Sequence, residues 1–135
     1  MMRRSGRLAL AALLAAGCGH PDYSQVSGDF VRLTLARDDG GNLGSVGRST
    51  QPDVYLRVTL RQAPIGAELP LACDWSDPSG KAVRHNRYHT KPITDPVWPT
   101  HCHQLFGPDS ATGTWTVDLL LQGHRIAQAR FELLP

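Results

Sequence analysis

The stretch from Gly113 to Leu134 constrains the fold most strongly, because apolar and polar side chains alternate along two arms joined by Gln122-Gly123. The apolar positions are Trp115, Val117, Leu119 and Leu121 in the first arm, and Ala127, Ala129, Phe131 and Leu133 in the second. A period of two on both sides of a short glycine-containing turn is typical of a β-hairpin with one buried face. A single hairpin is only marginally stable in water, so other strands must cover this face.

Four further segments have the character of strands, at residues 29–37, 53–61, 69–75 and 81–90. The segment 53–61 alternates most clearly, and its apolar positions are Val54, Leu56, Val58 and Leu60. The segment 81–90 is polar on both faces, which is typical of an edge strand. Residues 91–106 hold a candidate seventh strand. Residues 38–52 are rich in glycine and small polar side chains and predict a long loop.

Six short strands with a candidate seventh, without a convincing helix in the body, predict an all-β fold. We expect an antiparallel immunoglobulin-like β-sandwich over residues 29–135. The spacing of Gly113, Trp115 and Val117, followed by a close at Phe131-Glu132-Leu133, resembles the last two strands of immunoglobulin-like domains in bacterial surface lipoproteins. This resemblance implies an architecture and leaves the ligand open.

The N-terminus carries a short cationic segment with Arg3, Arg4 and Arg7, followed by an apolar run from Leu8 to Ala16. Nine residues of helix span roughly 14 Å, about half of a hydrocarbon core, so the run is too short to cross a membrane. It predicts a secretory signal.

The sequence Leu14-Ala15-Ala16-Gly17-Cys18 resembles the lipobox of bacterial lipoproteins. The resemblance implies cleavage after Gly17, a diacylglyceryl thioether on Cys18 and acylation of the new N-terminus. Residues 1–17 are then a signal peptide and residues 18–28 a tether. In such lipoproteins an aspartate after the cysteine favours the inner membrane, whereas Gly19 implies an outer-membrane destination. Three acyl chains would hold the protein firmly without a spanning element.

The balance of charge gives no indication of a nucleic-acid partner. The whole chain has 14 Lys+Arg and 12 Asp+Glu, but three of the basic residues lie in residues 1–17. The mature chain would have 11 basic and 12 acidic residues, a net charge of −1. The 118 residues left after cleavage are enough for one domain and too few for two.

With Cys18 assigned to lipid, Cys73 and Cys102 remain. An even pair in an oxidising exported compartment predicts a disulfide. Such a bridge would close a loop of about 30 residues and stabilise the fold by on the order of 3–4 kcal/mol. Because Cys102 precedes the strand of Trp115, this is not the bridge of antibody domains; an inter-strand or a strand-to-loop bridge is expected.

Four histidines, His85, His89, His101 and His103, form the only concentrated polar feature. Neutral imidazole binds zinc and copper, so a metal site is one hypothesis. On a strand, His85 and His89 would lie about 13 Å apart, whereas His101 and His103 would lie about 6.6 Å apart and could chelate. Surface histidines on an edge strand and a loop are the alternative.

The sequence offers no constellation typical of catalysis. There is no Gly-x-Ser-x-Gly elbow, and the acidic residues are dispersed. We therefore expect a non-enzymatic binding or accessory module without a cofactor. Its partners would be the membrane, through the lipid, and a protein of the cell envelope. A periplasmic zinc- or copper-binding protein is the alternative.

Overall fold

The computed structural model describes residues 21–135, so the predicted signal peptide and Cys18 lie outside the described residues. A short 3-10 turn, Arg48–Thr50, separates the second strand from the third. Eight strands follow one another: β1 (Ser27–Thr34), β2 (Ser45–Gly47), β3 (Asp53–Arg61), β4 (Pro70–Ser76), β5 (Ala82–His89), β6 (Trp98–Leu105), β7 (Gly113–Leu121) and β8 (His124–Leu134).

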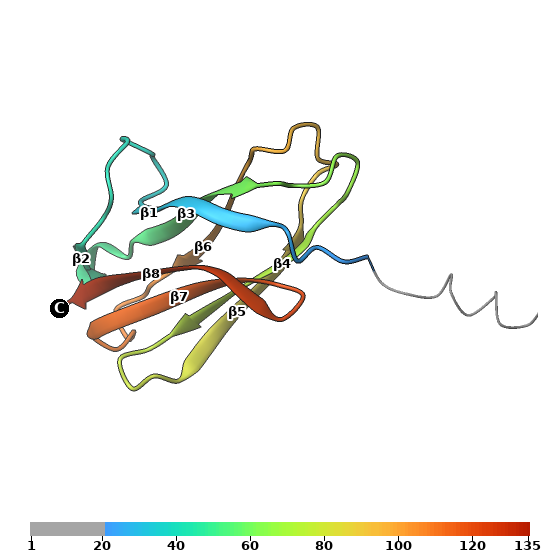
Figure 1. Cartoon of the computed structure of the whole chain (residues 1–135). Coiled ribbons are helices and arrows are strands. Elements are labelled where there is room, and N and C mark those ends of the chain that lie inside the picture. Colours follow the sequence, from blue (N-terminus) through green and yellow to red (C-terminus); the bar gives the residue numbers. More distant parts are fainter. Residues whose placement is uncertain (1–20) are drawn as a thin grey trace, which may run out of the picture.

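The strands form two sheets that pack face to face (Figure 1). One sheet has the order β1-β3-β6, and the other has the order β2-β8-β7-β4-β5. All pairings are antiparallel except that of β2 with β8. The predicted all-β sandwich is confirmed, and the candidate strand in residues 91–106 is β6. The polar segment 81–90 forms β5, which is an edge strand as expected.

The closing hairpin forms as predicted, with Leu121 opposite His124 and two residues between them. Gln122 and Gly123 both have positive φ, at 52° and 79°. Positive φ at both central residues is the geometry of a type I′ turn, whose twist matches that of the flanking strands. The hairpin supplies the central strand of the larger sheet, β7, and its neighbour β8.

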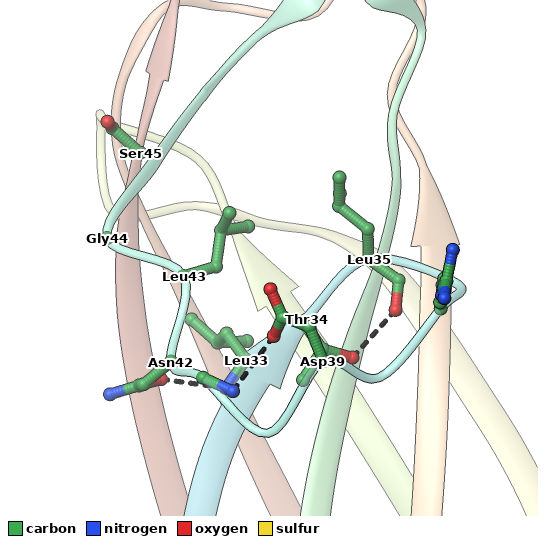
Figure 2. A pocket seen from close by; sticks show the side chains of 10 residues that line it. Leu33, Thr34, Leu35, Asp39, Asn42, Leu43, Gly44 and Ser45 are labelled. Atoms are coloured by element: carbon green, nitrogen blue, oxygen red, sulfur yellow. Dashed lines mark hydrogen bonds between the residues drawn. The ribbon is translucent and has the colours of Figure 1, made fainter.

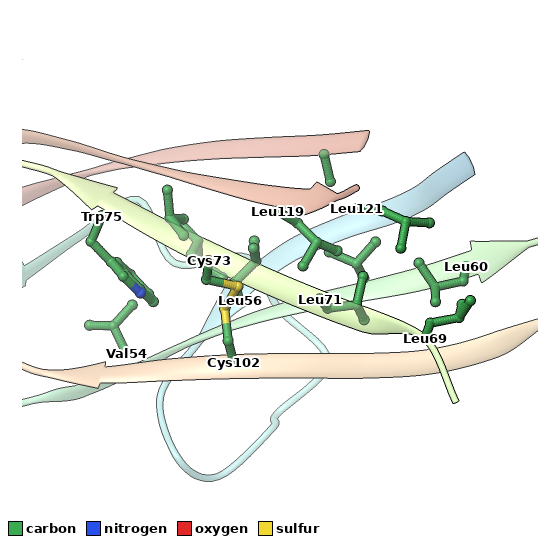
Figure 3. Packing of buried hydrophobic residues seen from close by; sticks show 14 of the residues in the cluster. Val54, Leu56, Leu60, Leu69, Leu71, Cys73, Trp75, Cys102, Leu119 and Leu121 are labelled. Carbon is green, nitrogen blue, oxygen red and sulfur yellow. A yellow bond between two sulfur atoms is a disulfide. The ribbon is translucent and has the colours of Figure 1, made fainter. Parts of the chain in front are cut away.

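The type of side chain in the core changes along the length of the sandwich (Figure 3). Toward one end the edges of Phe106 meet the rings of Trp75, Trp115 and Phe131. Toward the other end the core is aliphatic, with Leu60, Leu69, Leu71, Ile93 and Leu121 buried. Between them lies the Cys73–Cys102 disulfide, which links β4 to β6 and therefore joins the two sheets.

The structure differs in two ways from the predicted strand 29–37 and loop 38–52, and the first concerns the segment 35–44 (Figure 2). The first strand ends at Thr34 rather than Arg37, because the chain folds back: Leu33 accepts a hydrogen bond from the amide of Leu43. The amide of Leu33 donates in turn to the side chain of Asn42, at 2.9 Å. The predicted loop 38–52 also contains a strand, β2, which is too short to show alternation.

The sandwich has two ends, which we define by their loops. The proximal end comprises the loops 62–69 and 90–97 and the turn 122–123, and the described chain starts there. The distal end comprises the segment 35–44 and the loops 77–81 and 106–112. Within residues 21–135, no helix combines the length and the apolar character needed to cross a bilayer.

The body starts earlier than the predicted boundary at residue 29. Val26 is buried in the core and Tyr23 packs against it. The side chain of Gln122 donates a hydrogen bond to the carbonyl of Pro21 at 2.7 Å and accepts one from the amide of Tyr23 at 3.3 Å. The second half of the predicted tether is therefore part of the sandwich.

Candidate functional site

A hollow with a volume of about 720 Å³ lies at the distal end. This hollow is lined by the end of β1 and by the chain that folds back after β1. Leu33, Leu35 and Leu43 give the hollow an apolar wall, and Arg37 and Asp39 bring charge to it (Figure 2). Such a mixed lining suits the binding of a side chain or small group that is partly apolar.

Two arginines on the outer face of the β1-β3-β6 sheet hold this segment in place. Arg32 forms two parallel hydrogen bonds with Asp38, at 2.9 and 2.8 Å, and donates to the carbonyl of Gly41 at 3.1 Å. Arg57 donates to the hydroxyl of Thr34 at 2.9 Å and to the carbonyl of Ala36 at 3.3 Å. The forked guanidinium fixes direction as well as distance, so the segment has a defined shape.

Arg32, Asp38 and Arg57 form a clamp on this segment, and their charges interact strongly. The hydrogen bonds from Arg32 keep the pKa of the Asp38 carboxyl well below its usual range, and the amide of Gly40 lowers it further. The same carboxylate raises the pKa of Arg32. Asp38 is therefore ionised under all physiological conditions and holds the segment rather than exchanging protons.

His101 and His103 lie on the outer face of β6, with Tyr55 of β3 opposite His103 and Arg57 opposite His101. The ring of His103 stacks on that of Tyr55 with centroids 4.6 Å apart, and the ring of His101 lies 5.5 Å away. Arg57 covers the same tyrosine ring, at 4.8 Å. Cys102 points inward between the histidines, as a period of two predicts.

Partial burial, with Arg57 and His103 nearby, lowers the pKa of His101, so its ring is neutral at neutral pH. The Nδ1 atom of His103 lies 2.9 Å from a carboxylate oxygen of Asp53. That contact fixes the ring and leaves Nε2 free to meet a ligand. Of the two histidines, His103 is therefore the one whose ring is fixed by a carboxylate.

His85 and His89 lie elsewhere, on β5 at the edge of the other sheet. Nδ1 of His85 lies 2.8 Å from Asp74 of the adjacent strand. The four histidines are therefore not gathered at one place. Among residues 21–135, no three or more His, Cys, Asp or Glu side chains are arranged to hold a metal ion.

No protein-family model and no curated protein matches the chain. Solved structures do match its fold. An immunoglobulin-like protein of Pseudomonas aeruginosa, PA1606, aligns with a TM-score of 0.57 at 12% identity, over 81% of this chain and 96% of that one. The chain has an immunoglobulin-like fold.

A second similar structure is the alkylpurine DNA glycosylase AlkC of Pseudomonas fluorescens, bound to DNA that contains an abasic site analogue. It aligns with a TM-score of 0.57 at 17% identity over 82% of this chain. The match spans only 31% of the glycosylase, so the chain corresponds to less than a third of that protein. At this identity the similarity concerns the fold alone.

Sequence reasoning missed the clamp of Arg32, Asp38 and Arg57, and also the contact of Tyr55 with the rings of His103 and His101. Alternation does place Tyr55 and Arg57 on the outer face of β3. The contact with β6 depends on the register that sets Tyr55 opposite His103 and Arg57 opposite His101. Register is not readable from one strand alone.

Proposed function

We propose that this protein is a lipid-anchored, non-enzymatic accessory module of the cell envelope that presents the distal end of its sandwich to a protein partner. One observation carries the proposal. Pro21, three residues after the lipobox-like Cys18, is hydrogen-bonded to Gln122 at the proximal end, and the distal hollow lies at the opposite end. A lipid on Cys18 would hold one end at the bilayer and direct the other away from it.

The distal surface has properties that suit binding. Its shape is set by Arg32 and Arg57, so little conformational entropy is lost when a partner docks. The adjoining face of Tyr55, His101 and His103 adds aromatic and polar area, and such side chains are enriched at interfaces. The charged groups of the clamp are already paired, which favours recognition over proton transfer.

The anchor is tested by the Cys18→Ser variant of the full chain, followed by membrane fractionation and metabolic labelling with palmitate. We expect the wild type in the membrane fraction with label, and the variant without label in the soluble fraction. A variant that stays membrane-bound would refute the lipid anchor.

The partner surface is tested by a photo-crosslinking residue at Leu35, whose side chain is 40% exposed at the distal hollow. Val97, 45% exposed at the proximal end, is the matched control position. We expect a discrete protein adduct from position 35 in the native envelope, absent from position 97. Equal or absent adducts at both positions would exclude distal recognition.

A second candidate function is the binding of zinc or copper by His101 and His103. The observation that favours it is the contact of His103 with Asp53, because ligand histidines commonly bind a carboxylate through their second nitrogen. The remaining ligands would come from solvent or a partner. Elemental analysis after exposure to zinc or copper should show bound metal that His101→Ala removes and His85→Ala retains. Wild-type protein without metal would exclude this function.

A further inference from the structure

We propose that the proximal end of the sandwich lies directly on the bilayer, with Ile65 and Val97 in contact with the lipid interface. This inference rests on the proposed lipid anchor at Cys18. It adds a second contact with the membrane, made by the body itself, and it fixes which end of the molecule is available to partners.

The first argument is the length of chain between the lipid and the body. Only Gly19 and His20 separate Cys18 from Pro21. A fully extended residue spans at most about 3.6 Å, so Cys18 lies within about 11 Å of Pro21. The interfacial region of a bilayer is several ångströms deep on each side. A spacer of this length leaves little room for water between the body and the headgroups.

The second argument is that Pro21 is fixed to the body at the proximal end. The side chain of Gln122, in the β7-β8 turn, holds Pro21 and Tyr23 through two hydrogen bonds. The amide of Val26, a buried residue, donates to the carbonyl of Tyr23 at 3.0 Å. The chain therefore leaves the body beside this turn and cannot act as a longer tether without breaking these contacts.

The third argument is what the proximal end exposes. Ile65 is 66% exposed near the tip of the loop 62–69, and Val97 is 45% exposed at the close of the loop 90–97. Main-chain hydrogen bonds join these loops, from Ala63 to Pro96 at 3.0 Å and from Gly66 to Ile93 at 2.8 Å. The two exposed apolar side chains thus belong to loops that are bonded to each other at the proximal end.

Exposed apolar side chains also occur at the distal end, where Leu105 is 61% and Leu134 is 45% exposed. The exposed fractions alone therefore do not decide which end contacts the membrane. The position of Pro21 decides it, because β8 spans eleven residues and extends roughly 35 Å along the sandwich. A lipid within about 11 Å of Pro21 cannot bring Leu105 or Leu134 to the same bilayer surface.

The charge of the proximal end indicates an apolar contact rather than an electrostatic one. Lys91 and Arg125 are outnumbered by Asp22, Glu68 and Asp95, and Arg61 is paired with Asp29. Attraction to anionic lipids requires a cluster of basic residues. We therefore expect the contact to form on zwitterionic phosphatidylcholine, where apolar burial is the driving force.

The test uses the full lipidated protein with a single introduced thiol, since the acyl chain occupies Cys18 and the disulfide occupies Cys73 and Cys102. Ile65→Cys and Val97→Cys are labelled with an environment-sensitive fluorophore. Leu105→Cys and Leu134→Cys are the controls, matched in exposure. Each protein is reconstituted in phosphatidylcholine vesicles with or without brominated acyl chains.

We expect a blue shift of emission and a loss of intensity with brominated lipid for the labels at positions 65 and 97, and neither change at positions 105 and 134. Acylated, vesicle-bound protein in which all four labels behave alike would overturn this inference and leave the anchor intact. Wild-type protein that carries no acyl chain would overturn the anchor and this inference together.

Discussion

The two ends of the sandwich are stabilised by different means. At the distal end the core is aromatic, with Phe106 in edge contact with three rings, and charged side chains hold the chain that closes it. At the proximal end the core is aliphatic, and the loops that close it bind one another through main-chain hydrogen bonds. The disulfide lies between the two halves and belongs to neither.

This difference suits the two tasks that we propose for the ends. Main-chain hydrogen bonds between the loops 62–69 and 90–97 do not depend on the ionisation of side chains, which suits the end that we propose to lie at a membrane. The segment clamped by Arg32 and Arg57 keeps its shape through charged hydrogen bonds to Asp38 and to main-chain carbonyls. The shape of the distal end should therefore depend on the charge of Asp38, and that of the proximal end should not.

The largest expected effect is on the aromatic half of the core. Phe106→Ala removes a ring that is 2% exposed and touches three others, and should lower the free energy of unfolding by about 3–5 kcal/mol. Chemical denaturation measures this loss. Phe106→Leu, which keeps most of the volume, should cost about 1.5 kcal/mol or less. A loss of less than about 1.5 kcal/mol in Phe106→Ala would contradict a stabilising role for these ring contacts at the distal end.

The disulfide should act on both ends together. In Cys73→Ala/Cys102→Ala, loss of a bridge with a sequence separation of 29 should cost about 3–4 kcal/mol. Native-state hydrogen exchange should then show the same loss of protection for the slowest amides of both halves. Loss confined to one half would place the bridge within that end rather than between the two.

A close approach of β1 to β8 should make the proximal half sensitive to a single methyl group. A Cβ at Gly28 would lie 2.6 Å from the carbonyl oxygen of Ile126, so backbone has to move. We expect Gly28→Ala to lower the free energy of unfolding by about 1–3 kcal/mol. Gly44→Ala at the distal end, where nothing lies within 4 Å, is the control and should change it by about 0.5 kcal/mol or less. A neutral Gly28→Ala would contradict the close packing.

The smallest effect should be local, in the clamped segment. Asp38→Asn weakens the bonds to Arg32, so the amide of Gly40, which donates to Asp38, should exchange faster with little change in overall stability. Asp95→Asn, which alters a similar bond to Val97 at the other end, is the control and should leave Gly40 unchanged. Unchanged exchange at Gly40 in Asp38→Asn would rule out the clamp.

Acid should act in the same way as Asp38→Asn. The folded pKa of Asp38 lies below the ordinary value of 3.8, so its contribution is complete above that pH and is lost as the pH falls through the folded pKa. The hydrogen bonds between Arg32 and Asp38 should therefore persist at pH 4 to 5 and be lost only in stronger acid.

Period-two alternation was sufficient to predict most of the fold. It placed Val54 to Leu60 and Trp115 to Leu121 on the inner faces, and it separated the inward Cys102 from the outward His101 and His103. It could not reveal β2, because three residues are too few for a period. It could not pair Tyr55 with His103 or Arg32 with Asp38 either, because those contacts depend on register and on a loop that folds back.

The entry of the chain through β1 has a mechanical consequence. β1 runs from the proximal to the distal end and pairs with β3 from Ser27 to Thr34. If Cys18 is fixed and a partner pulls on the distal end, tension follows the axis of β1. Antiparallel hydrogen bonds lie across that axis, so they share the load in shear and do not open one at a time. A molecule built this way should withstand traction between a membrane and whatever it holds.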